Sequence, residues 1–235
     1  MTAIERTLFD SDHEIFRDTV RRFVEDEIAP FHAQWEKDGK ISREAWLKAG
    51  ELGLLCASMP EDYGGGGVER TYSVILLEEL ARAGATGPGF GLHSEIVAPY
   101  INSYGSEEQK RKFLPKMAKG EMIGAIAMTE PGTGSDLQGV RTTAIKDGNE
   151  LVINGAKTFI TNGEMSDVVI VVVKTDPDAG AKVISMVLVE ADREGIHKGR
   201  HPKKLGRKAP DTSEQFCDVA RVPTTQLPSA PANRF

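Results

Sequence analysis

The chain of 235 residues is poor in the features that mark disulfide-rich and metal-binding proteins. It has two cysteines, Cys56 and Cys217, which lie far apart in the sequence and form no CxxC pair. This pattern predicts buried thiols in a reducing compartment rather than a disulfide framework. The sequence also has neither an HExxH motif nor a His-rich tract. We therefore expect no metal site.

Long apolar runs and an excess of positive charge are absent too. No stretch approaches the ~18 consecutive apolar residues of a membrane span, and segment 1–14 is acidic, without the apolar core of an export signal. The formal net charge of -6 argues against a general nucleic-acid-binding protein. A content of 40% hydrophobic and 27% charged residues is typical of a globular protein. We expect a cytoplasmic protein with no membrane span.

The first half of the chain, residues 1–120, predicts a helical domain. Ser11 and Glu14 have the spacing of a capping box, and apolar residues at helical spacing then run to Ile28, with Pro30 ending the helix. Ser42 is the predicted N-cap of the next helix. Further helices are expected around residues 72–80 and 90–104, and around 113–117 after a second capping box formed by Ser106 and Gln109.

The second half, residues 121–235, predicts a β domain. Short β-branched runs alternate with turn signals, which favours an antiparallel barrel or sandwich. Asp147-Gly148-Asn149 predicts a hairpin, and Asn154-Gly155 a further turn. Strands are expected near residues 122–128, 141–146, 150–153, 157–161, 168–173, 183–189 and 212–219. The predicted fold class is therefore α+β, with the helical domain first.

One strand opens into a loop of glycines and hydroxyls that has the chemistry of a nucleotide site. The loop follows Thr129 and contains Gly132-Thr133-Gly134. A dinucleotide fingerprint would need a third glycine at Leu137 and a long helix after it, and neither is found. Gly155-Ala156-Lys157-Thr158 is not a P-loop, because Ala156 separates the glycine from the lysine.

The residues around this loop predict contacts to a flat, phosphate-bearing cofactor. Thr129 can hydrogen-bond a ring edge, while Gly134 and Ser135 can offer N–H groups and a hydroxyl to a diphosphate. Phe159 can lie against the ring and Thr161 can bond its rim. An equally open interpretation is a plain Gly/Ser loop between two strands, with Phe159 in the core.

These segments carry a resemblance to a known family. The stretch from Ala127 to Gly139 resembles the acyl-CoA dehydrogenase motif Thr-Glu-Pro-Gly, a small residue, then Gly-Ser-Asp, and segment 155–163 is similar to that family's second flavin-contact segment. Other matching segments are Phe16 to Phe23, Met59 to Gly65, Leu205-Gly206, Asp211-Thr212 and Arg221-Val222-Pro223. The resemblance covers residues from about 10 to about 225 and is greatest to the long-chain branch.

The resemblance implies an FAD-dependent α,β-desaturation of a fatty acyl-CoA, with an electron-transfer flavoprotein or similar acceptor. The residues that it implies for FAD contact are Ile126, Met128, Thr129, Gly134, Ser135, Phe159, Ile160 and Thr161. Ser135 would also lie near the pantetheine of the acyl-CoA. Phe159 stands where many members have tryptophan, and Ile126 where an aromatic residue is usual.

The family's proton-abstracting glutamate belongs to a C-terminal four-helix domain, which we expect to be absent here. After Arg221-Val222-Pro223 the sequence runs into Pro228 and Pro231, which oppose a helix. We therefore assign no catalytic residue, and expect uncovered apolar surface on the helices and an uncertain place in the family's homo-oligomer. The alternatives are a truncated dehydrogenase, a non-catalytic remnant or partner subunit, and a related acyl-CoA oxidase.

Several other charged residues are predicted to be structural. Glu130 and Asp136 could form an acid–base pair, but supporting the loop is the favoured role. His93 lies in an apolar helical segment and is predicted to be packed or half-exposed. Glu78 and Glu79 are predicted to be surface charges of an amphipathic helix.

Overall fold

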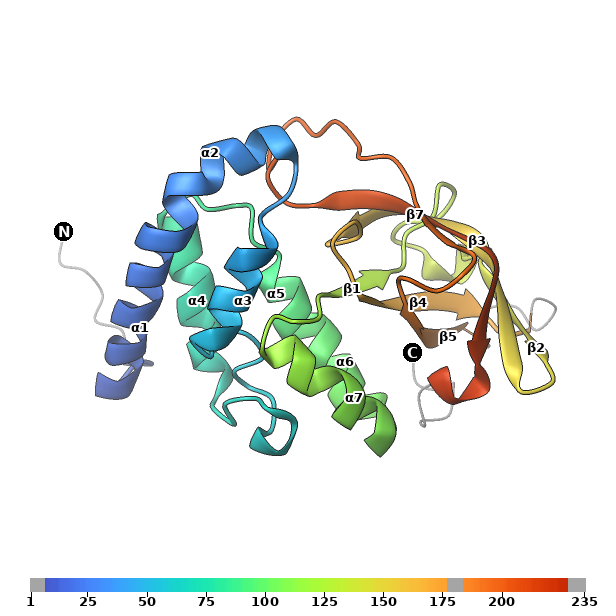
Figure 1. The fold of residues 1–235 in the computed structure, drawn as a ribbon, viewed down its shortest axis with the longest axis horizontal. Coiled ribbons are helices and arrows are strands. Elements are labelled where there is room, and N and C mark those ends of the chain that lie inside the picture. The colour runs from blue at the N-terminus through green and yellow to red at the C-terminus, as the bar shows by residue number, and fades with distance from the viewer. Residues whose placement is uncertain (1–6, 177–183, 228–235) are drawn as a thin grey trace.

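A computed structural model describes residues 7–176 and 184–227, and divides them into a helical domain and a sheet domain (Figure 1). The helices gather at one end of the molecule and the curled sheet at the other. This order agrees with the predicted fold class. The proline-containing tail after residue 227 lies outside the described residues. Among the described residues, no helix has the length and apolar character needed to cross a membrane.

The helical domain consists of helices joined by short turns, close to the predicted positions. Its elements are α1 (Ser11–Phe23), η1 (Val24–Ile28), α2 (Ala29–Asp38), α3 (Arg43–Glu51), η2 (Glu61–Tyr63), α4 (Arg70–Arg82), α5 (Phe90–Leu92), η3 (His93–Val97), α6 (Ala98–Tyr104) and α7 (Glu107–Ala118). Ser42 caps α3, as predicted, and Ser106 with Gln109 forms the predicted capping box of α7.

The predicted start of the first helix is wrong by one residue. The N-cap is Asp10, not Ser11, because the Asp10 carboxylate accepts the N–H groups of Asp12 and His13. The third helical residue is therefore His13, whose ring closes the box back to the N-cap backbone. An aspartate one position earlier thus competes successfully with the serine.

The predicted end of that helix at Pro30 is also wrong. The helix continues through the π-helical segment η1 into α2, and ends at Gly39 with a left-handed φ of 73°. The π-helical segment η3 is likewise followed by Pro99 in α6. In each case the proline occupies the first turn of the following α-helix, where a missing N–H costs little.

Within the described part of the chain, the sheet has seven strands and mixed pairing. They are β1 (Gly124–Ala127), β2 (Thr143–Asp147), β3 (Glu150–Thr161), β4 (Val168–Lys174), β5 (Ile184–Glu190), β6 (Ile196–Lys198) and β7 (Thr212–Pro223). The path is β1-β4-β2-β3-β7-β6, and β5 pairs with β4. The pairs β2–β3, β3–β7, β6–β7 and β4–β5 are antiparallel, as predicted. Strand β4 is parallel to both β1 and β2, which the sequence did not indicate.

The hairpin at Gly148-Asn149 is confirmed, whereas the turn predicted at Asn154-Gly155 is not. Strand β3 runs through both residues, with a shift in its pairing to β7 between Ile153 and Gly155. A Cβ on Gly155 would lie 2.3 Å from Thr142 Oγ1. The glycine therefore marks close approach of a neighbouring chain segment, and not a change of direction.

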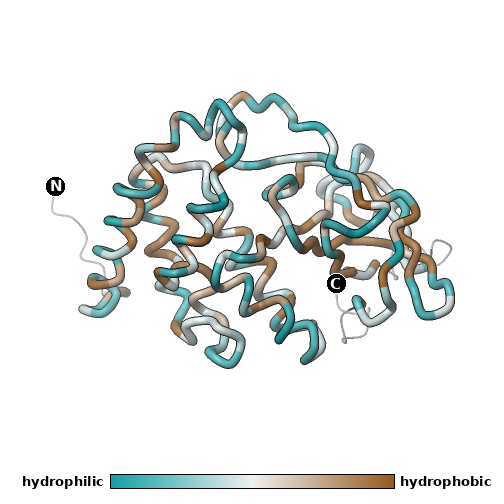
Figure 2. Tube along the Cα trace, viewed as in Figure 1, coloured by the Kyte–Doolittle hydropathy of each residue, from teal (hydrophilic) through white to brown (hydrophobic). Residues whose placement is uncertain are grey.

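In residues 7–176 and 184–227, buried hydrophobic side chains form three clusters. One fills the helical domain around Trp46 and Phe90, and another fills the sheet. A third spans both domains, packing Val97 and Met117 against Ile126 and other residues of the sheet. Figure 2 shows hydrophobic stretches on the helices and on the central strands. The two domains therefore share a core, which keeps β1 fixed against the helices.

Glu79 is not a surface charge, which corrects the prediction for it. Only 2% of Glu79 is exposed, and its carboxylate lies 3.3 Å from an Arg17 nitrogen, 3.0 Å from Arg21 and 2.7 Å from Arg82. Hydrogen bonds from Arg21 and the other arginines outweigh burial and lower the pKa of Glu79 to about 2. Glu78, which is half-buried, pairs with Arg17. Arg17 and Arg21 thus join α1 to α4 through the Glu79 carboxylate.

Candidate cofactor site

The two segments of the predicted site are hydrogen-bonded to each other near both of their ends. At one end, Asn162 Nδ2 donates to the carbonyl of Gly124 over 3.2 Å. At the other, the N–H of Thr158 donates to the carbonyl of Thr129 over 2.9 Å. Between these points β1 and β3 lie against each other. Thr129 is thereby brought next to Thr158 and the following Phe159.

A bulge in β3 turns Phe159 outward. Leu151, Ile153 and Lys157 are buried, so strict alternation would bury position 159 as well. Instead the pairing with β7 shifts between Lys157 and Ile160, and Phe159 takes a left-handed φ of 57°. Its side chain is 64% exposed while Ile160 is buried. The interpretation that placed Phe159 in the core is therefore wrong.

The loop after Thr129 is folded back by its own backbone. Glu130 and Thr133 exchange two backbone hydrogen bonds, of 2.9 and 3.1 Å, which makes the Pro131-Gly132 segment a tight turn. Gly134 and Ser135, which follow it, are exposed. A Cβ on Gly134 would meet nothing within 4 Å. The backbone here is open to a ligand.

The other predicted contact residues are less accessible. Ile126 and Ile160 are buried in the core, so their side chains are turned away from solvent. Met128 and Thr161 are half-buried. The predicted set therefore divides into exposed groups, half-buried groups at the ends of the two strands, and core residues.

A buried ion pair between Lys157 and Glu130 stabilises the loop that follows Thr129. Lys157 Nζ lies 2.9 Å from Glu130 Oε1 and 3.1 Å from the carbonyl of Met128. The same carboxylate accepts the N–H groups of Arg141 and Thr142 and the Thr142 hydroxyl. Burial would raise the pKa of Glu130, but these hydrogen bonds outweigh it and lower that pKa. The predicted structural role for Glu130 agrees with this network.

Three supporting residues were not singled out by sequence analysis: Lys157, His93 in its hydrogen-bonding role, and Asn162. Lys157 continues the inward positions of Leu151 and Ile153, and that alternation is the signal that would have found it. His93 is fully buried, which confirms that it is packed. Its partners, like those of Asn162, are distant in sequence, so no local pattern indicated them.

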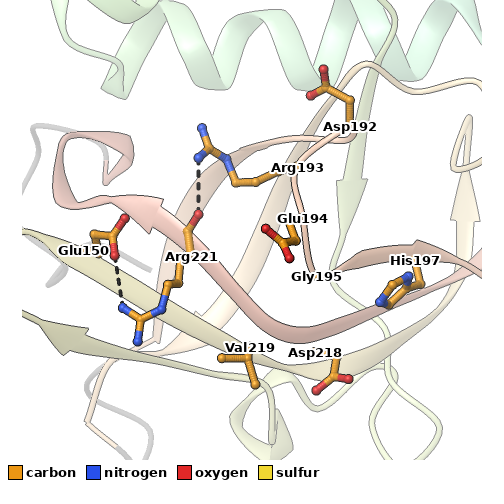
Figure 3. Close-up of a pocket in the computed structure, with 9 residues that line it drawn as sticks. All are labelled: Glu150, Asp192, Arg193, Glu194, Gly195, His197, Asp218, Val219 and Arg221. Atoms are coloured by element: carbon orange, nitrogen blue, oxygen red, sulfur yellow. Dashed lines mark hydrogen bonds and ion pairs between the residues drawn. The ribbon is translucent and has the colours of Figure 1, made fainter.

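A hollow of about 840 Å³ lies elsewhere on the sheet domain. Figure 3 shows its lining, in which the Arg193 side chain points toward the Arg221 carbonyl and the Arg221 side chain toward Glu150. Apart from Val219 its lining is polar, charged or glycine, and none of the predicted site residues belongs to it. It does not offer the aromatic surface that a flat cofactor needs.

Glu164, His201 and Asp211 form the group of metal-ligand types within the described residues, with ligand atoms within 4.8 Å of one another. Lys40 Nζ and His201 Nε2 each lie 2.5 Å from an oxygen of Glu164. The Lys40 ammonium thus occupies the position beside the Glu164 carboxylate where a metal ion would have to bind. Through Lys40, the cluster joins the loop between α2 and α3 to the sheet domain.

Comparison with known proteins identifies the family. Residues 10–121 match the N-terminal domain of acyl-CoA dehydrogenases, and residues 125–219 match the middle domain of the same family. The chain belongs to the acyl-CoA dehydrogenase family. The resemblance drawn from the motifs is confirmed by these matches.

Relatives in this family are similar to the chain over most of its length. The long-chain specific acyl-CoA dehydrogenase of Sus scrofa is 53% identical over 224 residues, which are 94% of this chain and 52% of that protein. The crystal structure of acyl-CoA dehydrogenase from Geobacillus kaustophilus has a TM-score of 0.94 and 46% identity, over 97% of this chain and 60% of the other. The chain therefore spans about half the length of the curated relatives that it matches.

A solved relative from Bacillus anthracis, acyl-CoA dehydrogenase complexed with FAD, has a TM-score of 0.87 and 35% identity, over 97% of this chain and 39% of that one. The groups in this chain fit such a cofactor chemically. The outward Phe159 offers a flat apolar face, and the open backbone at Gly134 offers N–H groups without side-chain obstruction. Thr129 and Thr161 supply hydroxyls at the strand ends.

Proposed function

We propose that this chain forms the flavin-contacting part of a dehydrogenase that converts fatty acyl-CoA to the α,β-unsaturated thioester. The observation that carries the proposal is the outward Phe159, fixed beside Thr129 by the Thr158–Thr129 hydrogen bond. FAD would supply hydride acceptance from the β-carbon. The electrons would pass to an electron-transfer flavoprotein or a similar acceptor.

In this proposal the chain's own residues bind and orient the flavin and the acyl-CoA. Phe159 would cover one face of the ring system, and Met128, Thr129 and Thr161 would contact its edge. Backbone N–H groups at Gly134 and the hydroxyl of Ser135 would bind the diphosphate. Ser135 would also lie near the pantetheine of the acyl-CoA. Ile126 and Ile160 support these groups from the core.

The buried carboxylates of Glu79 and Glu130 are poor candidates for the proton-abstracting base. Each accepts several hydrogen bonds, and each has a lowered pKa. A base for α-proton abstraction needs a carboxylate that reaches the substrate and is free to accept a proton. We therefore assign binding and orientation to the site residues named above, and assign no catalytic residue among residues 7–176 and 184–227.

FAD titration with matched phenylalanine variants tests the proposal. Phe159 and Phe216 are both exposed aromatic residues of the sheet domain, but only Phe159 lies at the site. We expect Phe159→Ala to raise the Kd for FAD about tenfold, which corresponds to ~1.4 kcal/mol of lost stacking. Phe216→Ala should leave the Kd unchanged. No saturable FAD binding, or equal effects of the two variants, would overturn the proposal.

The alternative, a partner subunit without activity of its own, is favoured by one observation. Val74, Leu77 and Ile96 are each 40–45% exposed on the helical domain. A chimera tests it, in which residues 1–223 continue into the remaining part of the Geobacillus kaustophilus relative. Bleaching of its bound flavin by an acyl-CoA supports the dehydrogenase. Flavin binding without bleaching supports the partner subunit.

A further inference from the structure

The backbone N–H and the carbonyl of Gly124, the first residue of β1, are each hydrogen-bonded to a buried side chain. His93 Nδ1 lies 3.0 Å from the backbone nitrogen of Gly124. Asn162 Nδ2 lies 3.2 Å from the carbonyl oxygen of the same glycine. His93 is 0% exposed and Asn162 is 3% exposed. Water therefore cannot replace either partner without opening the core.

The other contacts of His93 determine its protonation. Its Nε2 lies 3.1 Å from the carbonyl of Met117, and a carbonyl only accepts, so Nε2 carries the hydrogen. Nδ1 must then be the acceptor that the Gly124 N–H requires. Burial lowers the pKa of His93 to about 4, which agrees with a neutral ring. The Cys56 thiol, 3.6 Å from Nε2, is also kept neutral because burial raises its pKa to about 12.

Asn162 connects the sheet domain to the helical domain through Gly89. It has a left-handed φ of 63°, and its amide also donates to the carbonyl of Gly89 over 3.2 Å. A Cβ on Gly89 would lie 1.8 Å from the Asn162 side-chain oxygen, so only glycine fits there. Gly89 precedes α5 and accepts the N–H of His93. These four residues, Gly89, His93, Gly124 and Asn162, are named the joint below.

We infer that His93 and Asn162 are positioning residues, which set where Thr129 and Thr161 stand relative to each other and to the helical domain. This inference rests on the proposed function. Thr161 immediately precedes Asn162, and Thr129 lies five residues after Gly124. Strand β1 has four residues and lies at the end of the strand path, where β4 is its one partner among the strands that the structure describes. Core packing and the bond from Lys157 to the Met128 carbonyl also hold this segment. At its two ends, its placement against β3 depends on the joint and on the Thr158–Thr129 bond.

Two near-isosteric variants separate the two hydrogen bonds of His93. In His93→Asn the amide oxygen can take the place of Nδ1 and accept from Gly124, while the donor to Met117 is lost. In His93→Gln the amide reaches the position of Nε2, and the acceptor for Gly124 is lost. If His93 only filled space, both substitutions would change Gly124 exchange and the Kd for FAD by the same amount.

The measurements are amide exchange of Gly124 by NMR on the 235-residue chain, and the Kd for FAD. We expect His93→Gln to speed Gly124 exchange at least tenfold and to weaken FAD binding about tenfold. His93→Asn should stay within about threefold of the original chain in both. Equal responses of the two variants, or unchanged Gly124 exchange in His93→Gln, would overturn the inference. ¹⁵N shifts of the ring should report the neutral Nε2–H form.

Asn162 gives a second route if the His93 variants do not fold. Asn162→Gly keeps the left-handed backbone accessible while removing the amide, so it should also speed exchange at Gly124 and weaken FAD binding. Asn149→Gly, in the exposed hairpin turn, is the control and should change neither. Normal exchange at Gly124 in Asn162→Gly contradicts the inference. If the original chain binds no FAD, the proposed function fails, whereas the exchange data still decide whether the joint holds β1.

Discussion

Lys157 Nζ lies 2.9 Å from Glu130 Oε1, and the lysine is only 1% exposed. The pair joins the inward side of β3 to the first residue of the loop that carries Gly134 and Ser135. Burial lowers the pKa of Lys157, and the neighbouring Glu130 carboxylate opposes that shift. A buried pair of this kind is sensitive to the loss of one partner, because the remaining charge stays desolvated.

We expect Lys157→Met to lower the free energy of unfolding by about 3–5 kcal/mol, because it leaves the Glu130 carboxylate buried without its cation. The double variant Lys157→Met/Glu130→Gln removes both charges and should recover at least half of that loss. Urea denaturation measures both. Lys146→Met, at an exposed position of β2, should change the stability by less than ~0.5 kcal/mol. A double variant as unstable as Lys157→Met would contradict this account.

The sequence predicted the local elements well wherever neighbouring residues decide the outcome. Ser42 and Ser106 cap their helices because the N–H groups that they accept lie three residues away. The hairpin after Asp147 follows from the turn residues themselves. The glycine-and-hydroxyl loop was recognised for the same reason, since its chemistry lies in consecutive residues.

The features that sequence analysis missed depend on partners distant along the chain. Glu79 was expected at the surface because its arginines on α1 lie 58 and 62 positions away. The outward turn of Phe159 depends on a bulge opposite β7, and strict alternation predicts the reverse. The parallel pairing of β1 with β4 is likewise a tertiary choice. The site residues could be proposed from motifs. Of the residues that hold them in place, Lys157 has a local sequence signal, whereas His93 and Asn162 do not.

Glu79 should make stability depend on pH in the acid range. Its pKa is about 2 in the folded chain, against an ordinary value of 4.5. Because the folded-state pKa is the lower one, the stabilisation is complete above about pH 4.5 and is lost as the pH falls toward 2. Glu79→Gln should cost about 2 kcal/mol at neutral pH, less than the full shift implies because Arg21 and Arg82 are partly solvated. The measurement is urea denaturation at a series of pH values.

Glu36→Gln is the matched control for that experiment. Glu36 is exposed on α2, and its replacement should leave both the stability at neutral pH and its acid dependence unchanged. If Glu79→Gln kept the same slope of stability against pH between about 4.5 and 2, the carboxylate would not be the group responsible.

His93 should contribute a separate acid dependence, which sets in at a higher pH than that of Glu79. Its pKa falls from 6.5 to about 4 on burial, so the unfolded chain takes up a proton in a range where the folded chain does not. Stability is therefore complete above about pH 6.5 and declines as the pH falls toward 4, by about 3 kcal/mol in total. His93→Asn removes this proton uptake and should flatten the curve between those values. His197→Asn, at an exposed position of β6, should leave the curve unaltered.

Phe159 is expected to show opposite effects on stability and on cofactor binding. Its left-handed φ of 57° is unfavourable for a residue with a Cβ, and its exposed ring gains little from burial. Phe159→Gly should therefore stabilise the chain by about 1 kcal/mol while weakening FAD binding. Val219 is the matched control, since it is also exposed and has a φ of 51°, but lies on β7 outside the site. Val219→Gly should stabilise the chain similarly and leave the Kd for FAD unchanged. Thermal melts with and without FAD measure both effects, and a loss of stability in Phe159→Gly would show that the ring packs in the folded chain.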